Sequence, residues 1–204
     1  MPSTTTGKRQ ARSRPAGLPT PMGMFFQGFL KHPVMVGSII PSSGRLIRKM
    51  LGPVDWGRCR LFVEYGPGVG TFCRPILERL APDAQLIAID TNADFIRYLR
   101  GTIADPRFSA VNGSAADVAQ IVRDHGDDGA DYVLSGLPFS TLPPGVGPAI
   151  AQATHDVLRP GGAFLVYQFS PKVKDFLVPH FDEIDHDMAW WNVPPAQLYW
   201  AHKT

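Results

Sequence analysis

Acidic residues are missing from the first quarter of the sequence. No Asp or Glu precedes Asp55, and the remaining chain carries 12 basic against 18 acidic residues. The basic residues that precede Asp55 are Lys8, Arg9, Arg12, Arg14, Lys31, Arg45, Arg48 and Lys49. A basic arm on an acidic body indicates an anionic partner, and either an anionic lipid surface or nucleic acid fits this pattern. The alternative for residues 1–17 alone is a merely solubilising tail.

Cysteines and long apolar runs are also scarce. Cys59 and Cys73 form neither a metal-ligand nor a disulfide pattern, so we interpret them as buried or incidental thiols in a reducing compartment and predict no metal site. No run of about 18 apolar residues is present, so we expect no membrane span. The first residues lack the apolar centre of a secretory signal, which favours a cytoplasmic protein.

Residues 1–20 are rich in Ser, Thr, Pro and Arg, and we expect a disordered basic arm there. Residues 21–54 are expected to form an N-terminal amphipathic helix and a lid. In the first part of this segment Met22, Phe25, Phe26 and Phe29 recur at i, i+3, i+4 and i+7, which places them on one face of a helix. Pro33 should end that helix.

A second helix is expected from Ser42 or Ser43, either of which can cap its N-terminus. Its predicted apolar face consists of Leu46, Ile47, Met50 and Leu51.

After Pro53 short apolar runs alternate with helical periodicity. Strands are predicted at 60–66, 84–90, 107–113, 129–139 and 161–170, and helices at 71–80, 92–101, 115–124 and 147–158. This alternation predicts an α/β fold with a parallel, doubly wound sheet. Residues 181–203 offer two further strands with no helix between them, so we expect an antiparallel C-terminal hairpin. Burial in this sheet is the default expectation for Trp190, Trp191 and Trp200.

The segment "VEYGPGVGTF" places Gly66, Gly68 and Gly70 where the first strand meets the first helix. Glycines there let the backbone approach a ligand and direct helix N–H groups toward it. Glu64 precedes the turn, and Asp90 ends the second strand, the usual place to bind a ribose. The alternatives are a tight turn in another nucleotide-binding fold, and a helix N-cap carboxylate at Asp90.

Together with the C-terminal hairpin, these features resemble the class I S-adenosylmethionine-dependent methyltransferases. The resemblance implies a Rossmann-like, seven-stranded, mostly parallel sheet with helices on both faces, in a domain spanning residues 55–204. It also implies S-adenosylmethionine as cofactor, S-adenosylhomocysteine as product and no metal. Many relatives carry an acid where Ser114 stands here. The residues implied to bind the cofactor are Glu64, Gly66, Pro67, Gly68, Gly70, Asp90, Thr91, Ser114, Ala115, Ser135 and Gly136.

The string "SGLPFSTLP", Ser135–Pro143, follows the fourth strand, where this superfamily places its substrate. We call it the acceptor string. Amine-methylating relatives carry a similar string, whose rigid proline turns carbonyl groups toward a nucleophilic nitrogen beside an aromatic ring. An amine that attacks a methyl group becomes cationic, and both groups stabilise that charge. The acceptor is therefore interpreted as an amine, with Leu137, Pro138 and Phe139 beside it.

A closer resemblance joins "VGSIIPSSGRLIRKM", "VEYGPGVG", "SGLPFSTLP" and "WWNVPPAQLYW" to the bacterial phospholipid N-methyltransferases, which are related to the rRNA adenine dimethylases. It implies stepwise methylation of phosphatidylethanolamine toward phosphatidylcholine by a protein bound peripherally to the inner face of the bacterial cytoplasmic membrane. Ser42 and Ser43 then meet the lipid phosphate, or act simply as helix caps. The residues expected to contact the membrane are Lys8, Arg9, Arg12, Arg14, Phe25, Phe26, Phe29 and Lys31.

The apolar face of the first helix agrees with an interfacial element. The alternative is that its three phenylalanines are core residues of a lid.

For catalysis, Tyr65 is a candidate to orient the amine, and His32 and His180 are candidate proton acceptors, although each histidine is more often structural. The alternative activities are methylation of RNA adenine or of another amine, and a cofactor-binding membrane adaptor without catalysis. Against RNA stand the acidic body and Ser135, where adenine dimethylases usually carry Asn, so no nucleic acid partner is expected.

Overall fold

The computed structural model describes residues 44–192 and 195–204, which form one seven-stranded sheet in the order β3-β2-β1-β4-β5-β7-β6. Five strands are parallel, and β7 pairs antiparallel with both β5 and β6. The predicted fold class is confirmed, including the C-terminal hairpin. The predicted arm and the Met22–Lys31 helix lie outside the described residues. The strands are β1 (Leu61–Tyr65), β2 (Gln85–Asp90), β3 (Phe108–Asn112), β4 (Ala130–Ser135), β5 (Leu158–Gln168), β6 (Glu183–Ala189) and β7 (Ala196–His202).

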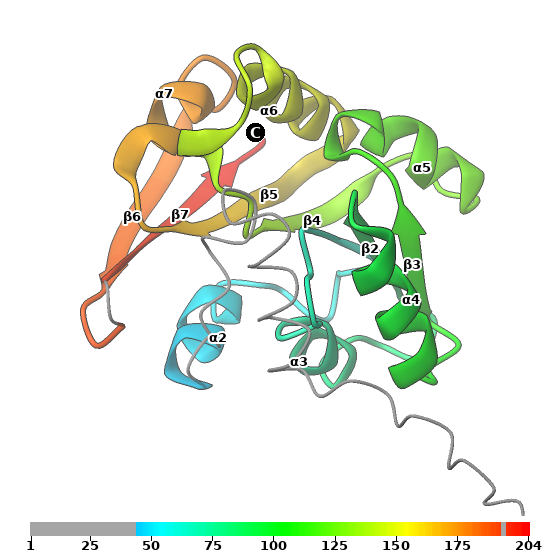
Figure 1. Cartoon of the computed structure of the whole chain (residues 1–204). Coiled ribbons are helices and arrows are strands. Elements are labelled where there is room, and N and C mark those ends of the chain that lie inside the picture. The colour runs from blue at the N-terminus through cyan, green and yellow to red at the C-terminus, as the bar shows by residue number, and fades with distance from the viewer. Residues whose placement is uncertain (1–43, 193–194) are drawn as a thin grey trace, which may run out of the picture.

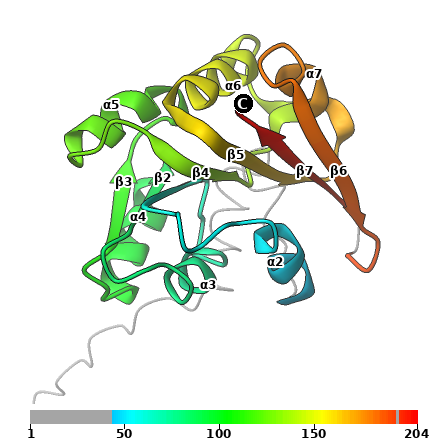
Figure 2. The same ribbon diagram turned by 180° about the vertical axis from the view of Figure 1, so that it is seen from behind.

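Helices cover both faces of the sheet, with α2, α3 and α4 on one face and α5, α6 and α7 on the other (Figures 1 and 2). None of the helices in the described part of the chain has the length and apolar character needed to cross a membrane. The helices are α2 (Gly44–Leu51), α3 (Cys73–Leu77), α4 (Ala93–Thr102), α5 (Val118–Asp124), α6 (Val146–Val157) and α7 (Lys174–Leu177), and the 3₁₀ turns are η1 (Ala115–Asp117), η2 (Phe139–Thr141) and η3 (Pro171–Val173).

Strand β1 is the centre of the sheet, and all five of its residues are buried. Alternate side chains enter opposite hydrophobic cores, because successive residues of a strand point to opposite faces. Phe62 packs with α2, α3 and α4, whereas Val63 and Tyr65 pack with α5, α6 and α7. Continuous burial on both faces is typical of a parallel sheet enclosed between two helical layers.

The helices expected within residues 44–192 are present, with two differences. Helix α3 is shorter than predicted because its end tightens, with Arg79 N–H donating to the Ile76 carbonyl oxygen at 2.9 Å. The short pair η3–α7 after β5 was not predicted, since it contains too few residues for an apolar periodicity to show.

Helix α2 is bound to the C-terminal hairpin. Its Leu46, Met50 and Leu51 are buried, in agreement with the predicted apolar face, and the Trp200 indole N–H donates to the Met50 carbonyl oxygen at 2.9 Å. The Lys49 ammonium donates to the Met188 carbonyl oxygen at 3.1 Å and pairs with Asp187. These contacts fix α2 and the hairpin as one surface.

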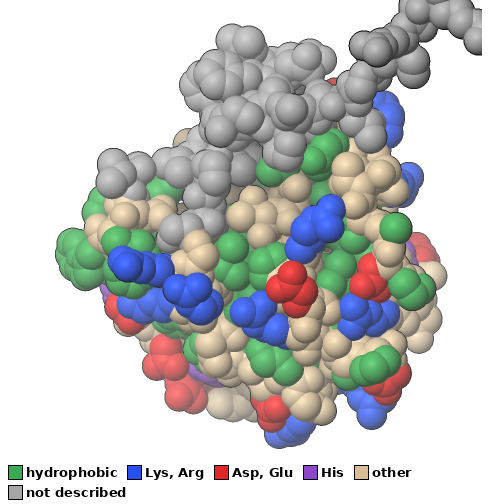
Figure 3. Space-filling model, turned by 90° about the horizontal axis from the view of Figure 1, so that it is seen from below, with side chains coloured by type: hydrophobic (Ala, Val, Ile, Leu, Met, Phe, Trp, Pro, Cys, Tyr) green, Lys and Arg blue, Asp and Glu red, His purple; other side chains and the backbone are tan. Residues whose placement is uncertain are grey.

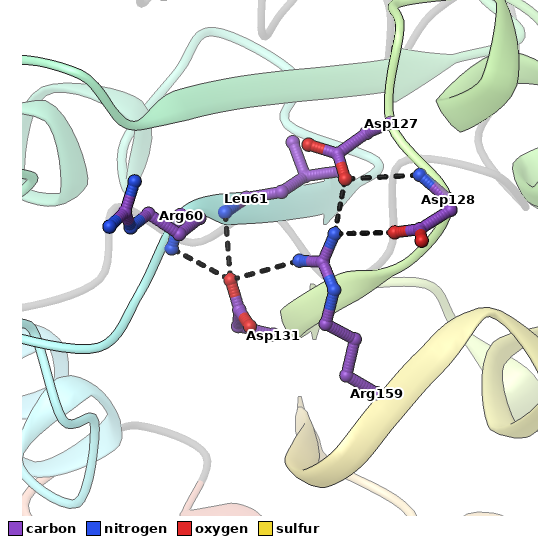
Figure 4. A network of polar contacts seen from close by, with 6 residues as sticks. All are labelled: Arg60, Leu61, Asp127, Asp128, Asp131 and Arg159. Atoms are coloured by element: carbon purple, nitrogen blue, oxygen red, sulfur yellow. Dashed lines mark hydrogen bonds and ion pairs between the residues drawn. The ribbon is translucent and has the colours of Figure 1, made fainter.

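At the amino edge of the sheet Arg159 joins the starts of three strands (Figure 4). Its guanidinium contacts Asp127, Asp128 at 2.8 Å and Asp131 at 3.4 Å. The Asp131 carboxylate also accepts from the backbone N–H groups of Arg60 and Leu61, at 2.7 and 2.9 Å. The hydrogen bond from Arg159 lowers the pKa of Asp128 below its ordinary value.

Replacing Arg159 with Met should destabilise the fold by about 2 kcal/mol, because three carboxylates then share one edge without their cation. Urea unfolding monitored by circular dichroism measures the change. Arg123→Met is the control, since Arg123 is exposed and contacts only Gln120 among the hydrogen bonds identified. Equal stability of the two variants would contradict a structural role for the cluster.

Candidate functional site

The carboxyl ends of β1, β2 and β4 meet at the point where the strand order reverses, with β2 on one side of β1 and β4 on the other. In open α/β sheets ligands bind in the crevice outside such a switch point. The glycine turn follows β1, Asp90 ends β2, and the acceptor string follows β4. The fold therefore brings together three motifs that are far apart in the sequence.

The glycine turn requires residues without a side chain. Gly66, Gly68 and Gly70 all have positive φ angles, of 62°, 54° and 80°. A Cβ atom at Gly66 would lie 2.9 Å from Leu137 Cδ2 of the acceptor string, and one at Gly70 would lie 2.7 Å from Leu99 Cδ2 of α4. Gly70 N–H donates to the Pro67 carbonyl oxygen at 2.8 Å, which closes the turn. At Gly70 the backbone itself therefore lies against the start of α3, where a side chain would not fit.

Glu64 places a carboxyl group beneath this turn. It is only 3% exposed, and it accepts a hydrogen bond from the Cys73 thiol at 3.1 Å. Burial raises the pKa of Glu64 to about 7, the thiol hydrogen bond opposes that rise, and the charge of Asp90 adds to it. A buried carboxyl at the end of a central strand is well placed to meet a cationic ligand group, because such a cation would favour its ionised form.

Asp90 faces the same turn from β2. Its carboxylate accepts from Gly68 N–H at 3.3 Å and from Asn92 N–H at 2.8 Å. Burial raises its pKa, and these two hydrogen bonds oppose the rise. The N-cap of α4 is Asn92, whose side chain accepts from Asp94 N–H at 2.9 Å. Asp90 is therefore not the capping residue, and its carboxylate holds the glycine turn to the end of β2.

The loop after β3 lies at the same edge. Ser114 caps η1 by accepting from Ala116 N–H at 3.2 Å, and Ala115 is buried. Asn112 donates through its side chain to the Asp90 carbonyl oxygen at 2.9 Å, so this loop is joined to the end of β2. Thr91 is exposed between the two. The predicted cofactor-binding residues from β1, β2 and β3 are thus contiguous.

The acceptor string begins at the buried Ser135, whose hydroxyl accepts from Leu137 N–H at 3.2 Å. Gly136 donates from its N–H to the Tyr65 carbonyl oxygen at 3.3 Å. Leu137 and Pro138 are half-buried, and Leu137 packs over Gly66. The glycine turn and the acceptor string are therefore in direct contact.

Tyr167 was not singled out from the sequence, yet the structure places its hydroxyl against the acceptor string. A Cβ atom at Gly136 would overlap the Tyr167 hydroxyl oxygen and lie 2.8 Å from its Cζ. The Tyr167 ring packs on Phe72, next to α3, with ring centroids 5.0 Å apart. A glycine one residue past the end of a buried strand was the available signal, because it indicates close approach of another group.

Tyr65 does not reach the site. It is fully buried, and its hydroxyl lies 3.2 Å from Thr154 Oγ1 of α6, on the face opposite Glu64. Burial raises the pKa of Tyr65 above its ordinary value. The prediction that Tyr65 orients the acceptor is wrong for this reason: adjacent residues of a strand point to opposite faces, and only Glu64 faces the turn.

His180 and Phe139 also point elsewhere. The centre of the His180 ring lies 6.5 Å from that of His155, which is in the last turn of α6. Because α6 ends where β5 begins, both rings lie toward the amino edge of the sheet, and the glycine turn lies at the carboxyl edge. Phe139 is 2% exposed and packs against Phe164 and Phe176 in the core. The roles predicted for these two side chains are therefore not supported. His32, Ser42 and Ser43 lie outside the described residues.

The three tryptophans of the hairpin differ in burial. Trp200 is buried as expected, but Trp190 and Trp191 are 69% and 43% exposed. The expectation of burial is wrong for these two, because β6 ends at Ala189 and the chain then leaves the sheet.

Residues 62–162 match the family model described as a methyltransferase domain. The chain is 33% identical over 180 residues to an ornithine lipid N-methyltransferase from Singulisphaera acidiphila, covering 87% of this chain and 94% of the relative.

Among solved structures, a precorrin-6y C5,15-methyltransferase from Geobacter metallireducens is 14% identical with a TM-score of 0.63, over 78% of this chain and 88% of that one. A 16S rRNA N2 G1207 methyltransferase from T. thermophilus, solved with AdoMet and guanosine, is 19% identical with a TM-score of 0.58, over 82% of this chain and 44% of that one. At such identities the likeness concerns the fold alone.

Ionisation of Glu64 should make the ligand-free protein less stable as the pH rises. Its pKa is about 7 in the folded state and near 4.5 when unfolded, so stability is greatest below the lower value and falls until the pH exceeds the higher one. The loss amounts to about 3 kcal/mol.

Urea unfolding at a series of pH values measures this slope, which Glu64→Gln should flatten. Glu78→Gln is the control, because Glu78 is exposed. A slope that persists in Glu64→Gln would show that another group causes it.

Proposed function

Since the chain belongs to the class I S-adenosylmethionine-dependent methyltransferases, we propose that it transfers a methyl group to the amine of a lipid headgroup at a membrane surface. The observation that carries the proposal is the contact between the glycine turn and the acceptor string, at Gly66 and Leu137. This contact brings the cofactor motif and the motif interpreted as amine-binding to one edge of the sheet.

The residues of the turn fit the cofactor. Glu64 offers a buried carboxyl group to the cationic methionine end, and Asp90 offers a carboxylate to the ribose hydroxyls. The glycines leave room for close approach, and the loop at Ser114 and Ala115 is placed to border the adenine. When bound, S-adenosylmethionine supplies an electrophilic methyl group.

The acceptor side is built from Gly136, Leu137 and Pro138. Backbone carbonyl groups at this rigid string would stabilise the positive charge that develops on the attacking nitrogen. The half-buried Tyr167 ring, which packs on the buried Phe72, provides aromatic surface on the same face of the sheet as Glu64, so Tyr167 replaces Phe139 in the role first expected of it.

The chain's own residues then act mainly by position. The amine must arrive without its extra proton, because an ammonium has no lone pair to attack with. The Tyr167 hydroxyl oxygen, beside Gly136, is placed to accept a hydrogen bond from the neutral amine and to direct its lone pair toward the glycine turn. Orientation of this kind can supply much of the rate acceleration.

The lipid class rests on two supports. The relative from Singulisphaera acidiphila is an ornithine lipid N-methyltransferase, and the motifs of this chain resemble those of phosphatidylethanolamine methyltransferases. Both headgroups present a primary amine, which is the chemistry that the proposal requires. Methylation of RNA adenine is less favoured, because Ser135 stands where adenine dimethylases usually carry Asn, and because the chain from Asp55 onward carries more acidic than basic residues.

Purified full-length protein should transfer label from S-adenosylmethionine to lipid vesicles. Separate arms contain phosphatidylethanolamine, ornithine lipid, and phosphatidylcholine, which has no free amine. Label in either of the first two arms and none in the third supports an amine headgroup and identifies it. Label that appears only in added RNA would overturn the proposal.

Tyr167→Phe should lower kcat about tenfold, because one orienting hydrogen bond is lost, while the affinity for S-adenosylmethionine stays unchanged. Lipid methylation kinetics and calorimetry measure the two quantities. Tyr132→Phe is the matched control, since the Tyr132 hydroxyl only accepts from Asp55 N–H toward the amino edge. An unchanged kcat in Tyr167→Phe would exclude the positioning role.

A further inference from the structure

An exposed pair of tryptophans stands at the edge of the sheet that carries the proposed reaction. Strand β7 is antiparallel to β5, and Gln197 near its start pairs with Gln168 at the end of β5. Met188 of β6 pairs with the same Gln197. The turn between β6 and β7 therefore lies at the carboxyl edge, together with the glycine turn and the acceptor string.

Trp190 and Trp191, at the start of this turn, are 69% and 43% exposed. Large hydrophobic side chains more than a third exposed are few among residues 44–192 and 195–204, and two of the three are Trp190 and Trp191. A tryptophan combines a large apolar ring with one N–H donor, and this amphipathic character enriches it where a membrane meets water.

Helix α2 carries three cations near the pair. Lys49 holds its ammonium 5.3 Å from the centre of the Trp191 ring and bonds to Met188 of the hairpin. Arg45 and Arg48 are exposed on the same helix, one turn or less away. We name this set, Arg45, Arg48, Lys49, Trp190 and Trp191, the Trp–Arg surface. Figure 3 shows hydrophobic side chains protruding beside Lys and Arg side chains at one end of the face that carries α2, α3 and α4.

The acidic groups nearby do not cancel this charge. Asp187 faces α2 from β6, but it pairs with Lys49. Asp185, two residues further toward the amino edge, lies 3.2 Å from His202. The two arginines therefore leave the Trp–Arg surface with an excess of positive charge.

The surface is also rigid. The bond from Trp200 to the Met50 carbonyl oxygen and the contacts of Lys49 hold α2 against the hairpin. Preformed surfaces lose little conformational entropy when they bind, which strengthens association.

We propose that the Trp–Arg surface docks on a bilayer that contains anionic lipid, with Trp190 and Trp191 inserted at the interface and Arg45 and Arg48 on the lipid phosphates. This inference rests on the proposed function, because docking through the carboxyl edge presents the acceptor string to lipid headgroups. It is separate from the membrane contact predicted for Lys8–Lys31, since every residue of the Trp–Arg surface lies within the described chain.

Sedimentation of the full chain with vesicles of phosphatidylcholine, with and without phosphatidylglycerol, tests the docking. Replacing both Trp190 and Trp191 with Ala should lower the partition coefficient at least about tenfold on either vesicle, because two apolar rings no longer insert. Replacing Arg45 and Arg48 with Gln should lower it about fivefold per cation, and only when phosphatidylglycerol is present.

Two variants serve as matched controls. Val178→Ala changes an exposed apolar residue, and Arg123→Gln an exposed cation, both on the opposite face of the sheet. Both should bind vesicles as the unaltered protein does. Urea unfolding checks that each variant is folded. Unchanged midpoints are expected, because all the altered residues, controls included, are exposed.

Undiminished vesicle binding by the Trp variant would overturn the proposal. So would a change in oligomeric state on ultracentrifugation without a change in vesicle binding, because it would identify the surface as a contact between two copies of the chain. No methyl transfer occurs in these measurements, so their outcome is distinct from failure of the lipid methylation assay.

Discussion

Parallel pairing of β1 with both of its neighbours is the constraint on which the site depends. Leu61–Tyr65 pairs in register with β2 on one side and with β4 on the other. Their carboxyl ends must therefore lie at one edge, together with the chain segments that follow them. Leu137 packs over Gly66 because of this pairing, although 70 residues of chain lie between these two residues. At the opposite edge of the sheet the Arg159 cluster joins the starts of β1, β4 and β5.

The pleat of the strands decides which side chains take part. Glu64 and Tyr167 point to the face covered by α2, α3 and α4, and Tyr65 points to the other. The proposed chemistry is thereby confined to one side of the sheet, where the buried Glu64 carboxyl group, the Tyr167 ring and the acceptor string lie. The hairpin extends the same edge outward to Trp190 and Trp191, so the proposed reaction and the proposed docking surface face one direction.

Much of this architecture could be predicted from the sequence. Each predicted strand is present because buried parallel strands are short apolar runs, although the strand predicted at 129–139 ends at Ser135. The Gly66–Gly70 turn was evident from its spacing. The contacts of single side chains were less predictable. Tyr65 looked available because it adjoins the turn, and Phe139 because it follows Pro138, yet both rings complete the core behind the sheet.

The sequence by itself determined the order of elements, the glycine turn after the first strand, and the charge asymmetry of the chain, because these follow from local patterns and composition. Only the tertiary structure decided that Tyr167 meets Gly136, that Trp190 and Trp191 leave the sheet, and that α2 joins the hairpin. Such contacts depend on the pairing of strands remote in the chain and on which face each residue occupies, and a shift of one residue would reverse them.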